Sequence, residues 1–410
     1  MTIGRGTRVW KAVKVENGHT VGEPVVLKDC WVPSGRSREG KIYARIHQSA
    51  KTPEDARALR SGLLTVLCHG DVFVSGTEDR TRILKGHPIS RSPFASLCNQ
   101  LSAPAYQAHY RIVFQEIGKD LERETSPAAA FKALKDVIRC FEALHNSGWV
   151  HADLNDGNII MCRDGTKLAD LELASREGEP RAHDYEGTPL FGAVELLHHK
   201  YLFKPSDRQS MAPVVSTSSI DPAYTHNPLH DLEGLWWIAV YSIATKGGHH
   251  SRRSLKQLVD FLFEDDKSYN NRTLTFLSDD QFNLHFKALH SSLSPDIVVP
   301  LQMLREKLIG AYRKAEENVP TLPSYTKLAS GLHQEFARAF GIISQKMEEE
   351  RFHVASVTSL GAIDVPDDGR PYFLPGGAGG ITAALPPHLD KGFGTLAQNL
   401  GKLSSLMSGL

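Results

Sequence analysis

The stretch from His151 to Asp170 contains several side chains that can bind a metal ion or accept a proton. Asp153 stands two positions after His151, and Asn158 follows five positions later. Amide and carboxylate oxygens, such as those of Asn158 and Asp170, are what Mg²⁺ needs when water and phosphate fill its remaining sites. A carboxylate beside such a metal–phosphate site can orient a hydroxyl and accept its proton, which is the role predicted for Asp153.

A β-hairpin is expected to bring the two predicted metal ligands together. Short apolar stretches on both sides of Asp164-Gly165 predict a hairpin with these two residues as its loop. In that register Asn158 faces Leu171, and Asp170 faces Ile159. Both side-chain oxygens would then lie at the open end of one hairpin.

Helices are expected to surround this hairpin. Ser126-Pro127 is a typical helix start, and Asn146-Ser147-Gly148 a typical stop, with apolar residues at helical spacing between them. Residues 230–244 are apolar nearly all round, which predicts a helix buried at the centre of a helical unit. Two amphipathic helices are expected around 298–312 and 332–347.

The first hundred residues have a different character. β-favouring residues on both sides of Asn17-Gly18 predict a hairpin, residues 39–49 a helix, and residues 63–67 and 111–117 further strands. A polar stretch near 76–105 is expected to be an inserted loop. The sequence therefore predicts a small, mostly β unit followed by a larger helical one.

Composition narrows the classes of function. The chain has 410 residues, with 47 Lys plus Arg and 47 Asp plus Glu, so no net field attracts it to nucleic acid or to an anionic membrane. Its five cysteines are scattered, without disulfide or zinc-ligand spacing, as is typical of a reducing compartment. No apolar run is long enough to span a bilayer. We therefore expect a soluble cytoplasmic or nuclear protein with neither nucleic-acid nor membrane partners.

Several motifs together resemble the fungal-type protein kinase family, a divergent branch of the protein-kinase fold. The pattern H-x-D-x-x-x-x-N, followed by an Asp after a hairpin, is that of the protein-kinase superfamily. The run GTPLFGAVELL resembles the end of an activation segment, where a Gly-Thr pair precedes a peptide-docking loop. The stretches RGTRVWKA, LKDCW, REGKIYARI, IVFQEIG and HDLEGLWW also resemble this family.

The resemblance implies an α+β, bilobal, protein-kinase-like fold and an enzyme that uses ATP and Mg²⁺ to phosphorylate Ser or Thr of a protein substrate. We expect a β-rich N-lobe over residues 1–118, a mainly helical C-lobe over 119–358 with a loop insertion near 202–228, and a Gly/Pro-rich, flexible tail over 359–410. The resemblance also implies residue roles: Asp153 as catalytic base, Asn158 and Asp170 as Mg²⁺ ligands, Lys28 on the α- and β-phosphates and paired with Glu39, Gly4, Gly6 and Val9 in the phosphate loop, Phe114, Gln115, Glu116 and Ile117 around the adenine, and His151, Glu195 and Asp231 as structural supports.

The sequence departs from the family pattern at several of these places. The third glycine of the phosphate loop is missing, and almost no first strand precedes that loop, so we expect a truncated N-lobe. Ala152 replaces the Arg that often precedes the catalytic Asp, and Asn155 stands where many Ser/Thr kinases have a Lys. Glu172 replaces the Gly that ordinarily ends the second metal-binding motif.

Two other functions therefore stay open. A pseudokinase would bind ATP weakly or not at all and act as a scaffold, in line with the incomplete phosphate loop. A small-molecule phosphotransferase of the aminoglycoside or choline kinase type would share H-x-D-x-x-x-x-N. The GTPLFGAVELL run argues against the second alternative, because such enzymes lack a peptide-docking loop.

Overall fold

The computed structural model describes residues 6–81, 106–179, 187–203, 225–246, 252–264, 268–290, 293–317 and 325–349. Gly4, most of the two expected loop insertions and the whole expected tail lie outside these ranges. The described chain forms two compact units. The first contains residues 6–41, 65–81 and 106–117, and the second contains residues 42–64 and those from 118 onward.

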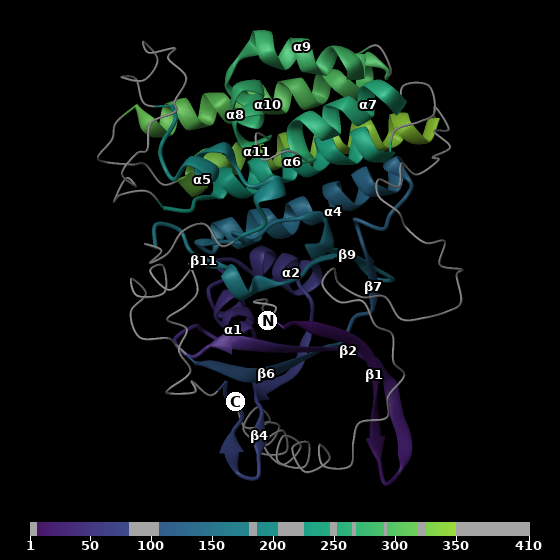
Figure 1. Ribbon diagram of the computed structural model, residues 1–410, viewed down its shortest axis with the longest axis vertical. Coiled ribbons are helices and arrows are strands. Elements are labelled where there is room, and N and C mark those ends of the chain that lie inside the picture. The colour runs from purple at the N-terminus through teal and green to yellow at the C-terminus, as the bar shows by residue number, and fades with distance from the viewer. Residues whose placement is uncertain are drawn as a thin grey trace, which may run out of the picture. The chain divides into compact units, whose positions relative to one another are not determined.

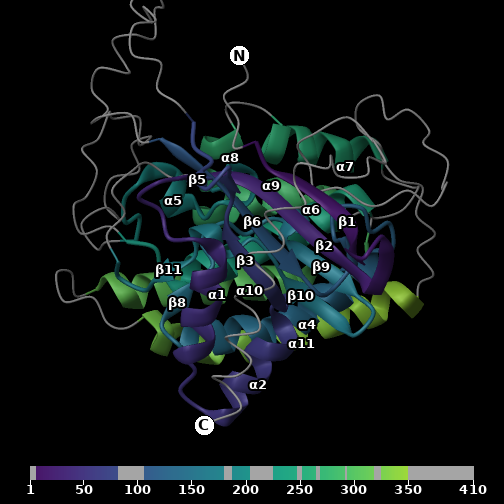
Figure 2. The same cartoon turned by 90° about the horizontal axis from the view of Figure 1, so that it is seen from below.

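A four-stranded sheet in the order β1-β2-β6-β3 forms the first unit (Figures 1 and 2). All of its pairings are antiparallel. The strands are β1 (Arg8–Glu16), β2 (His19–Pro33), β6 (Gln107–Phe114) and β3 (Val66–Asp71). Asn17 and Gly18 both have positive φ (51° and 79°), as a two-residue hairpin turn requires. This confirms the hairpin predicted at Asn17-Gly18.

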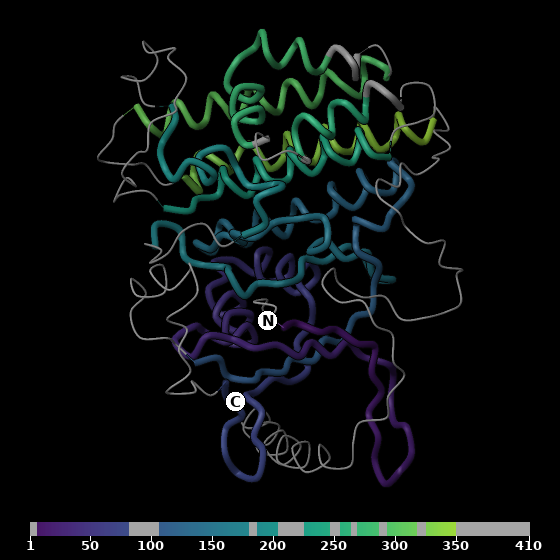
Figure 3. Tube along the Cα trace, viewed as in Figure 1, coloured from purple at the N-terminus to yellow at the C-terminus, as the bar shows by residue number. Residues whose placement is uncertain are grey.

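The strand predicted at 111–117 occurs as β6, which begins four residues earlier and ends three residues earlier than expected. Every second residue of β6 is buried, so the strand has one face on the core. A short hairpin of β4 (Phe73–Val74) and β5 (Thr77–Glu78) was not predicted. Figure 3 shows this hairpin and the longer β1–β2 hairpin extending from the sheet.

The strand predicted at 63–67 begins three residues late because a helix precedes it. Helix α2 (Pro53–Gly62) begins after Thr52, whose hydroxyl accepts a hydrogen bond from the backbone of Asp55 (3.0 Å). In the second unit α2 approaches α4 very closely, since a Cβ added at Gly62 would lie 2.4 Å from Cβ of Cys140. The predicted helix at 39–49 is confirmed as α1 (Glu39–Gln48).

Four long helices form the framework of the second unit (Figure 1): α4 (Pro127–Asn146), α6 (Pro228–Lys246), α10 (Pro295–Glu316) and α11 (Tyr325–Glu349). The predicted start of α4 is confirmed, because the Ser126 hydroxyl caps the N–H of Ala129 (3.2 Å). Helix α6 is buried along nearly its whole length, as predicted. Phe340 of α11 packs edge-on against Phe131 of α4, with ring centres 5.6 Å apart.

Shorter elements complete the second unit. The helical ones are α5 (Val194–His198), α7 (Arg252–Val259), a π-helical turn (Asp260–Glu264), α8 (Ser268–Leu277) and α9 (Asp279–His290). The strands are β7 (Gly118–Asp120), β8 (Trp149–Val150), β9 (Ile159–Cys162), β10 (Gly165–Leu168) and β11 (Ser175–Arg176). The 3₁₀ turns are η2 (Asp156–Asn158), η3 (Leu171–Leu173) and η4 (Pro189–Phe191).

A β-sheet unit from the N-terminal region and a helical unit from the C-terminal region confirm the predicted α+β, kinase-like fold class. Helices of the described ranges all fall short of the combined length and hydrophobicity that crossing a membrane would take.

Candidate active site

The loop that contains the predicted base is held at its start by a carboxylate of α6. Oδ2 of Asp231 accepts a hydrogen bond from the backbone N–H of His151 (2.7 Å), and Oδ1 accepts one from Ala152 (3.1 Å). Burial raises the pKa of Asp231, but the hydrogen bond and charge interaction with His145 outweigh it and hold this pKa well below its usual range. Asp231 is therefore ionised, and a charged acceptor makes the stronger hydrogen bonds.

Ala152 adopts an unusual backbone conformation at this point. Its φ angle is 67°, in the left-handed region that non-glycine residues occupy only when the surrounding structure imposes it. The side chain of His151 makes a second contact that fixes the loop: its Nε2 donates to the carbonyl oxygen of Ala169 (3.0 Å). The backbone of the loop is thus fixed from α6 and from the residue that precedes Asp170.

Asp153 is buried, and its carboxylate is bound by Thr188, in the run at 187–197 that resembles the end of an activation segment. Oδ1 accepts hydrogen bonds from the backbone N–H of Thr188 (2.7 Å) and from its hydroxyl (2.9 Å). The pKa of Asp153 is raised, first by burial and second by the negative charge of Asp170, although the Thr188 hydrogen bonds lower it. The two carboxylates therefore interact, and Asp153 is a stronger base than an exposed aspartate.

Asn158 holds the other end of the loop. Its Nδ2 donates to the carbonyl oxygen of Asp153 (2.8 Å), because a carbonyl oxygen can only accept. The Oδ1 atom is consequently the acceptor that the buried side chain retains. Asp170 as a residue is partly exposed. An amide oxygen and a carboxylate are donors of the type that hold Mg²⁺ together with water and phosphate.

A preformed cage of three or more carboxylate, histidine or cysteine side chains is absent from the part of the chain that the structure describes. Mg²⁺ is usually bound by one or two carboxylates plus substrate phosphates and water. The donor set at 158 and 170 fits that ion.

The predicted register of this hairpin is wrong: its loop lies one residue earlier, so each cross-strand partner differs by two residues. Gly165 pairs with Cys162 and Leu168 with Ile159, so the loop is Arg163-Asp164 instead of Asp164-Gly165. The physical reason is the place of the positive φ angle, which falls on Gly165 (130°) after the turn. Asn158 therefore lies opposite Ala169, whose N–H donates to its carbonyl oxygen (2.9 Å), and not opposite Leu171.

Asp170 is consequently not a strand residue facing Ile159. It lies two residues beyond the end of β10 with a left-handed backbone (φ 57°) and precedes η3. The structure still leaves Asn158 and Asp170 at the open end of the hairpin, next to the loop that contains Asp153.

In the first unit, Lys28 and Glu39 form a buried ion pair. Nζ of Lys28 lies 2.8 Å from Oε2 of Glu39, and both side chains are at least 96% buried. Glu39 is the first residue of α1, and the next amide, that of Gly40, donates to the hydroxyl of Tyr110 (2.9 Å). The structure thus brings together the two residues that the resemblance paired.

The remaining predicted nucleotide-binding residues also belong to the first unit. Phe114 is buried at the end of β6, and the N–H of Gln115 donates to the carbonyl oxygen of Thr65 (2.9 Å). Val9 pairs with Lys28 across β1 and β2. Further residues in this group are Gly6, which has positive φ (58°) and lies near Trp31, Glu116, whose carboxylate accepts from Thr65, and Ile117.

Glu195 is fully buried at the end of the activation segment. Its Oε1 accepts from the N–H of Leu202 (2.7 Å), and its Oε2 lies 3.1 Å from Nε2 of His230 in α6. The contact fixes the segment's end to the same helix that holds the catalytic loop. The docking loop before it is bound by Arg272 of α8, whose guanidinium donates to the carbonyl oxygens of Pro189 (2.6 Å) and Leu190.

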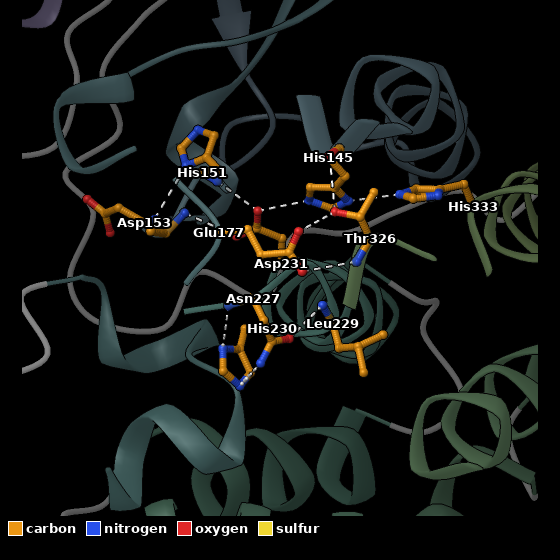
Figure 4. A network of polar contacts seen from close by, with 11 residues as sticks. His145, His151, Asp153, Glu177, Asn227, Leu229, His230, Asp231, Thr326 and His333 are labelled. Carbon is orange, nitrogen blue, oxygen red and sulfur yellow. Dashed lines mark hydrogen bonds and ion pairs between the residues drawn. The ribbon is translucent and has the colours of Figure 1, made fainter. Parts of the chain in front are cut away.

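Sequence reasoning missed two groups of residues around the site, and the contact that a third residue, Asn155, makes. His145 and His333 form a buried pair that contacts Asp231 (Figure 4). Glu233, fully buried, accepts from the N–H of Val194 (2.8 Å). Asn155 donates to the hydroxyl of Thr188 (3.0 Å). The local signals were a polar residue on an apolar helix face at His145 and the departure from the family pattern at Asn155.

Comparison with known proteins agrees with this geometry. The profile of a family described as fungal protein kinase matches residues 1–243. The chain is 27% identical over 194 residues to the serine/threonine-protein kinase pim-2 of Danio rerio, covering 46% of this chain and 56% of that protein. It is 31% identical over 86 residues to the mitosis inhibitor protein kinase wee1 of Schizosaccharomyces pombe, covering 21% of this chain and 10% of that protein.

The chain thus spans about half the length of the first of these relatives and a tenth of the second. The profile match covers more than half of this chain, including the catalytic loop, the hairpin, the activation segment and α6. Taken together with the architecture and the polar contacts around Asp153, it establishes that the chain belongs to the fungal protein kinase family.

Proposed function

We propose that this protein transfers the γ-phosphoryl group of ATP to Ser or Thr hydroxyls of a protein substrate. The observation that supports this best is the state of Asp153. Both hydrogen bonds from Thr188 go to one carboxylate oxygen, Oδ1. The other oxygen, Oδ2, is proposed to orient the substrate hydroxyl and to accept its proton.

The charge environment supports the same role. Burial and the negative charge of Asp170 raise the pKa of Asp153, which makes its carboxylate a better proton acceptor. In phosphoryl transfer the base mainly positions the nucleophile, so a rigid carboxylate matters more than a strong one. The contacts of Thr188, Asn158 and Asp231 provide that rigidity for the loop.

Asn158 and Asp170 are proposed to hold Mg²⁺, and Lys28 to bind the α- and β-phosphates of ATP. When bound, Mg²⁺ would neutralise phosphate charge and orient the transferred group. The buried pair with Glu39 restricts the Lys28 side chain, which lowers the entropy lost when it binds phosphate. Gly6, Val9, Phe114, Gln115, Glu116 and Ile117 are proposed to line the nucleotide site.

A protein substrate is proposed because the docking loop is ordered and fixed. Arg272 binds the carbonyl groups of Pro189 and Leu190, and Glu195 closes the segment behind them.

We also propose lobes at 1–118 and 119–358 and a cytoplasmic or nuclear location.

A transfer assay with radiolabelled ATP and Mg²⁺, using a peptide library, choline and an aminoglycoside as acceptors, tests the proposal. Label on peptide that is lost in Asp153→Asn supports it. Label on a small molecule alone contradicts the protein substrate. Binding of Mg-ATP in a thermal-shift assay without transfer to any acceptor contradicts the enzymatic role and supports the scaffold.

A further inference from the structure

The family profile matches residues 1–243, and helix α11 lies beyond them. Its side chains nevertheless connect, through a series of buried hydrogen bonds, to the loop that contains His151 and Asp153. Nε2 of His333, on α11, lies 2.9 Å from Nδ1 of His145 on α4. Nε2 of His145 lies 3.1 Å from Oδ2 of Asp231 on α6. The same oxygen accepts the N–H of His151 (2.7 Å), two residues before the proposed base. Figure 4 shows this chain.

The side chains of this series, His333, His145 and Asp231, are buried. His145 is fully buried, His333 is 1% exposed and Asp231 is 3% exposed. Asp231 is ionised and can only accept, so Nε2 of His145 must donate to it. The hydrogen bond at the other nitrogen of a histidine sets its tautomer and its ring orientation. That bond is made by His333.

Without His333, Nδ1 of His145 would be buried and unsatisfied. Such a group costs free energy, and the ring can relieve the cost by rotating or by admitting water. Either change weakens the bond to Oδ2 of Asp231. The Asp231 carboxylate accepts hydrogen bonds from the amides of His151 and Ala152. A displaced carboxylate would therefore let the loop that contains these two residues move.

A second contact from α11 reaches the other side of the same loop. The hydroxyl and the N–H of Thr326 donate to the carboxylate of Glu177, the N–H at 3.2 Å. The N–H of Glu177 donates to Gly148 (3.0 Å), and the preceding strand β11 pairs with β8, which leads into His151. Helix α11 therefore contacts both structures that support the loop.

We propose that α11 is a positioning element of the active site, and that His333 is a positioning residue acting on Asp153 through His145, Asp231 and the amides of His151 and Ala152. The proposal rests on the proposed function for its effect on catalysis, but not for its effect on the loop. The proposal adds α11 to the elements that position the active site, beyond the residues 1–243 that the family profile matches.

The test replaces His333 by Leu, which removes the hydrogen bond at similar volume, and by Gln, whose amide can both donate and accept. Phe340→Leu is the matched control, because Phe340 is a fully buried residue of α11 that packs against Phe131. Two quantities are measured for each variant: amide hydrogen exchange of His151 and Ala152 by NMR, and the kcat and KM for ATP.

We expect His333→Leu to accelerate exchange of these two amides and to lower kcat by about 10-fold, with KM for ATP changed less than about twofold, because loop geometry limits the chemical step. His333→Gln should restore both quantities. Phe340→Leu should lower the melting temperature without changing either.

Unchanged protection and unchanged kcat in His333→Leu would overturn the proposal, as would an equal effect in Phe340→Leu. If the wild-type protein transfers no phosphate, the proposed function fails. The exchange data then still decide whether His333 positions the loop.

Discussion

The hydroxyl of Thr188 donates to Oδ1 of Asp153 at 2.9 Å, across 35 positions of sequence. The same hydroxyl accepts a hydrogen bond from Nδ2 of Asn155 (3.0 Å). The hydroxyl thus donates its single hydrogen to Asp153 and accepts one from Asn155, so both side chains hold it in place. Asn155 stands where many Ser/Thr kinases have a Lys. In this protein the residue at that position instead binds Thr188, which in turn binds the proposed base, Asp153.

Replacing Asp153 by Asn should abolish most transfer. The amide is nearly isosteric but cannot accept the substrate proton, so we expect kcat to fall by about 10³-fold, within the range for a general base. Initial rates with radiolabelled ATP measure the effect. Asp164→Asn, in the exposed hairpin turn, is the matched control and should leave the rate unchanged. Equal rates in wild type and Asp153→Asn would refute the assignment.

Thr188→Val should move the acid limb of the pH–rate profile to higher pH. The hydroxyl stabilises the carboxylate form of Asp153, so its loss raises a pKa that burial and Asp170 have already raised. The shift should be about one unit or less, because the backbone bond from residue 188 remains. Thr245→Val, whose hydroxyl bonds to Tyr241 within α6, provides the control. A shift to lower pH would contradict the argument.

Lys28→Met should lower the free energy of unfolding by about 3–5 kcal/mol, since it leaves the carboxylate of Glu39 buried without its cation. The double variant Lys28→Met/Glu39→Met should regain much of that stability and still lack transfer. Urea unfolding measures the first effect and the transfer assay the second. Lys132→Met breaks an exposed pair with Asp136 and should cost about 0.5 kcal/mol or less. A stable, active Lys28→Met would show that the pair is dispensable.

Asp170→Asn should weaken the thermal stabilisation by Mg-ATP, because one of the two proposed metal ligands loses its charge. We expect affinity for Mg-ATP to fall by about 10-fold or more, comparable to the loss of one charged hydrogen bond or ligand. Binding of ATP in excess EDTA should change much less. The Asp164→Asn variant again serves as the control. Equal losses with and without Mg²⁺ would place the effect elsewhere than at a metal.

The ionised carboxylate of Asp156 should destabilise the folded protein at pH 7, and this cost should shrink as the pH falls through about 6. Burial, followed by the negative charge of Glu122, raises the pKa of Asp156 from 3.8 to about 6. The unfolded chain has the ordinary value, so the charged form costs folding free energy above the folded-state pKa, and this cost disappears as the carboxyl is protonated. Two units correspond to at most about 3 kcal/mol.

Asp156→Asn should therefore raise the free energy of unfolding at pH 7 by more than it does at pH 5. The variant keeps a pH dependence of its own, because burial lowers the pKa of His230 to about 4 and that of His333 to about 3, so stability is lost as these histidines protonate in the unfolded chain. Urea unfolding at several pH values measures both effects, with the exposed Asp136→Asn as control. A gain at pH 5 as large as the gain at pH 7 would contradict the prediction.

Several elements could be predicted because their signals are local. Ser126-Pro127 begins α4, Asn17-Gly18 makes a hairpin turn, and the apolar run at 230–244 is a buried helix. The catalytic register could not be obtained this way. Which residue at the turn takes the positive φ angle depends on strand twist and packing. A glycine can take it either within the loop or, as Gly165 does, directly after it.

The sequence by itself determined which residue types stand near the catalytic loop, because the spacing of His151, Asp153 and Asn158 is a property of one short segment. Only the tertiary structure decided what holds them. Thr188 meets Asp153 across 35 positions, and His333 meets His145 across 188. Contacts of that range depend on how α4, α6 and α11 pack, and no local pattern encodes that packing.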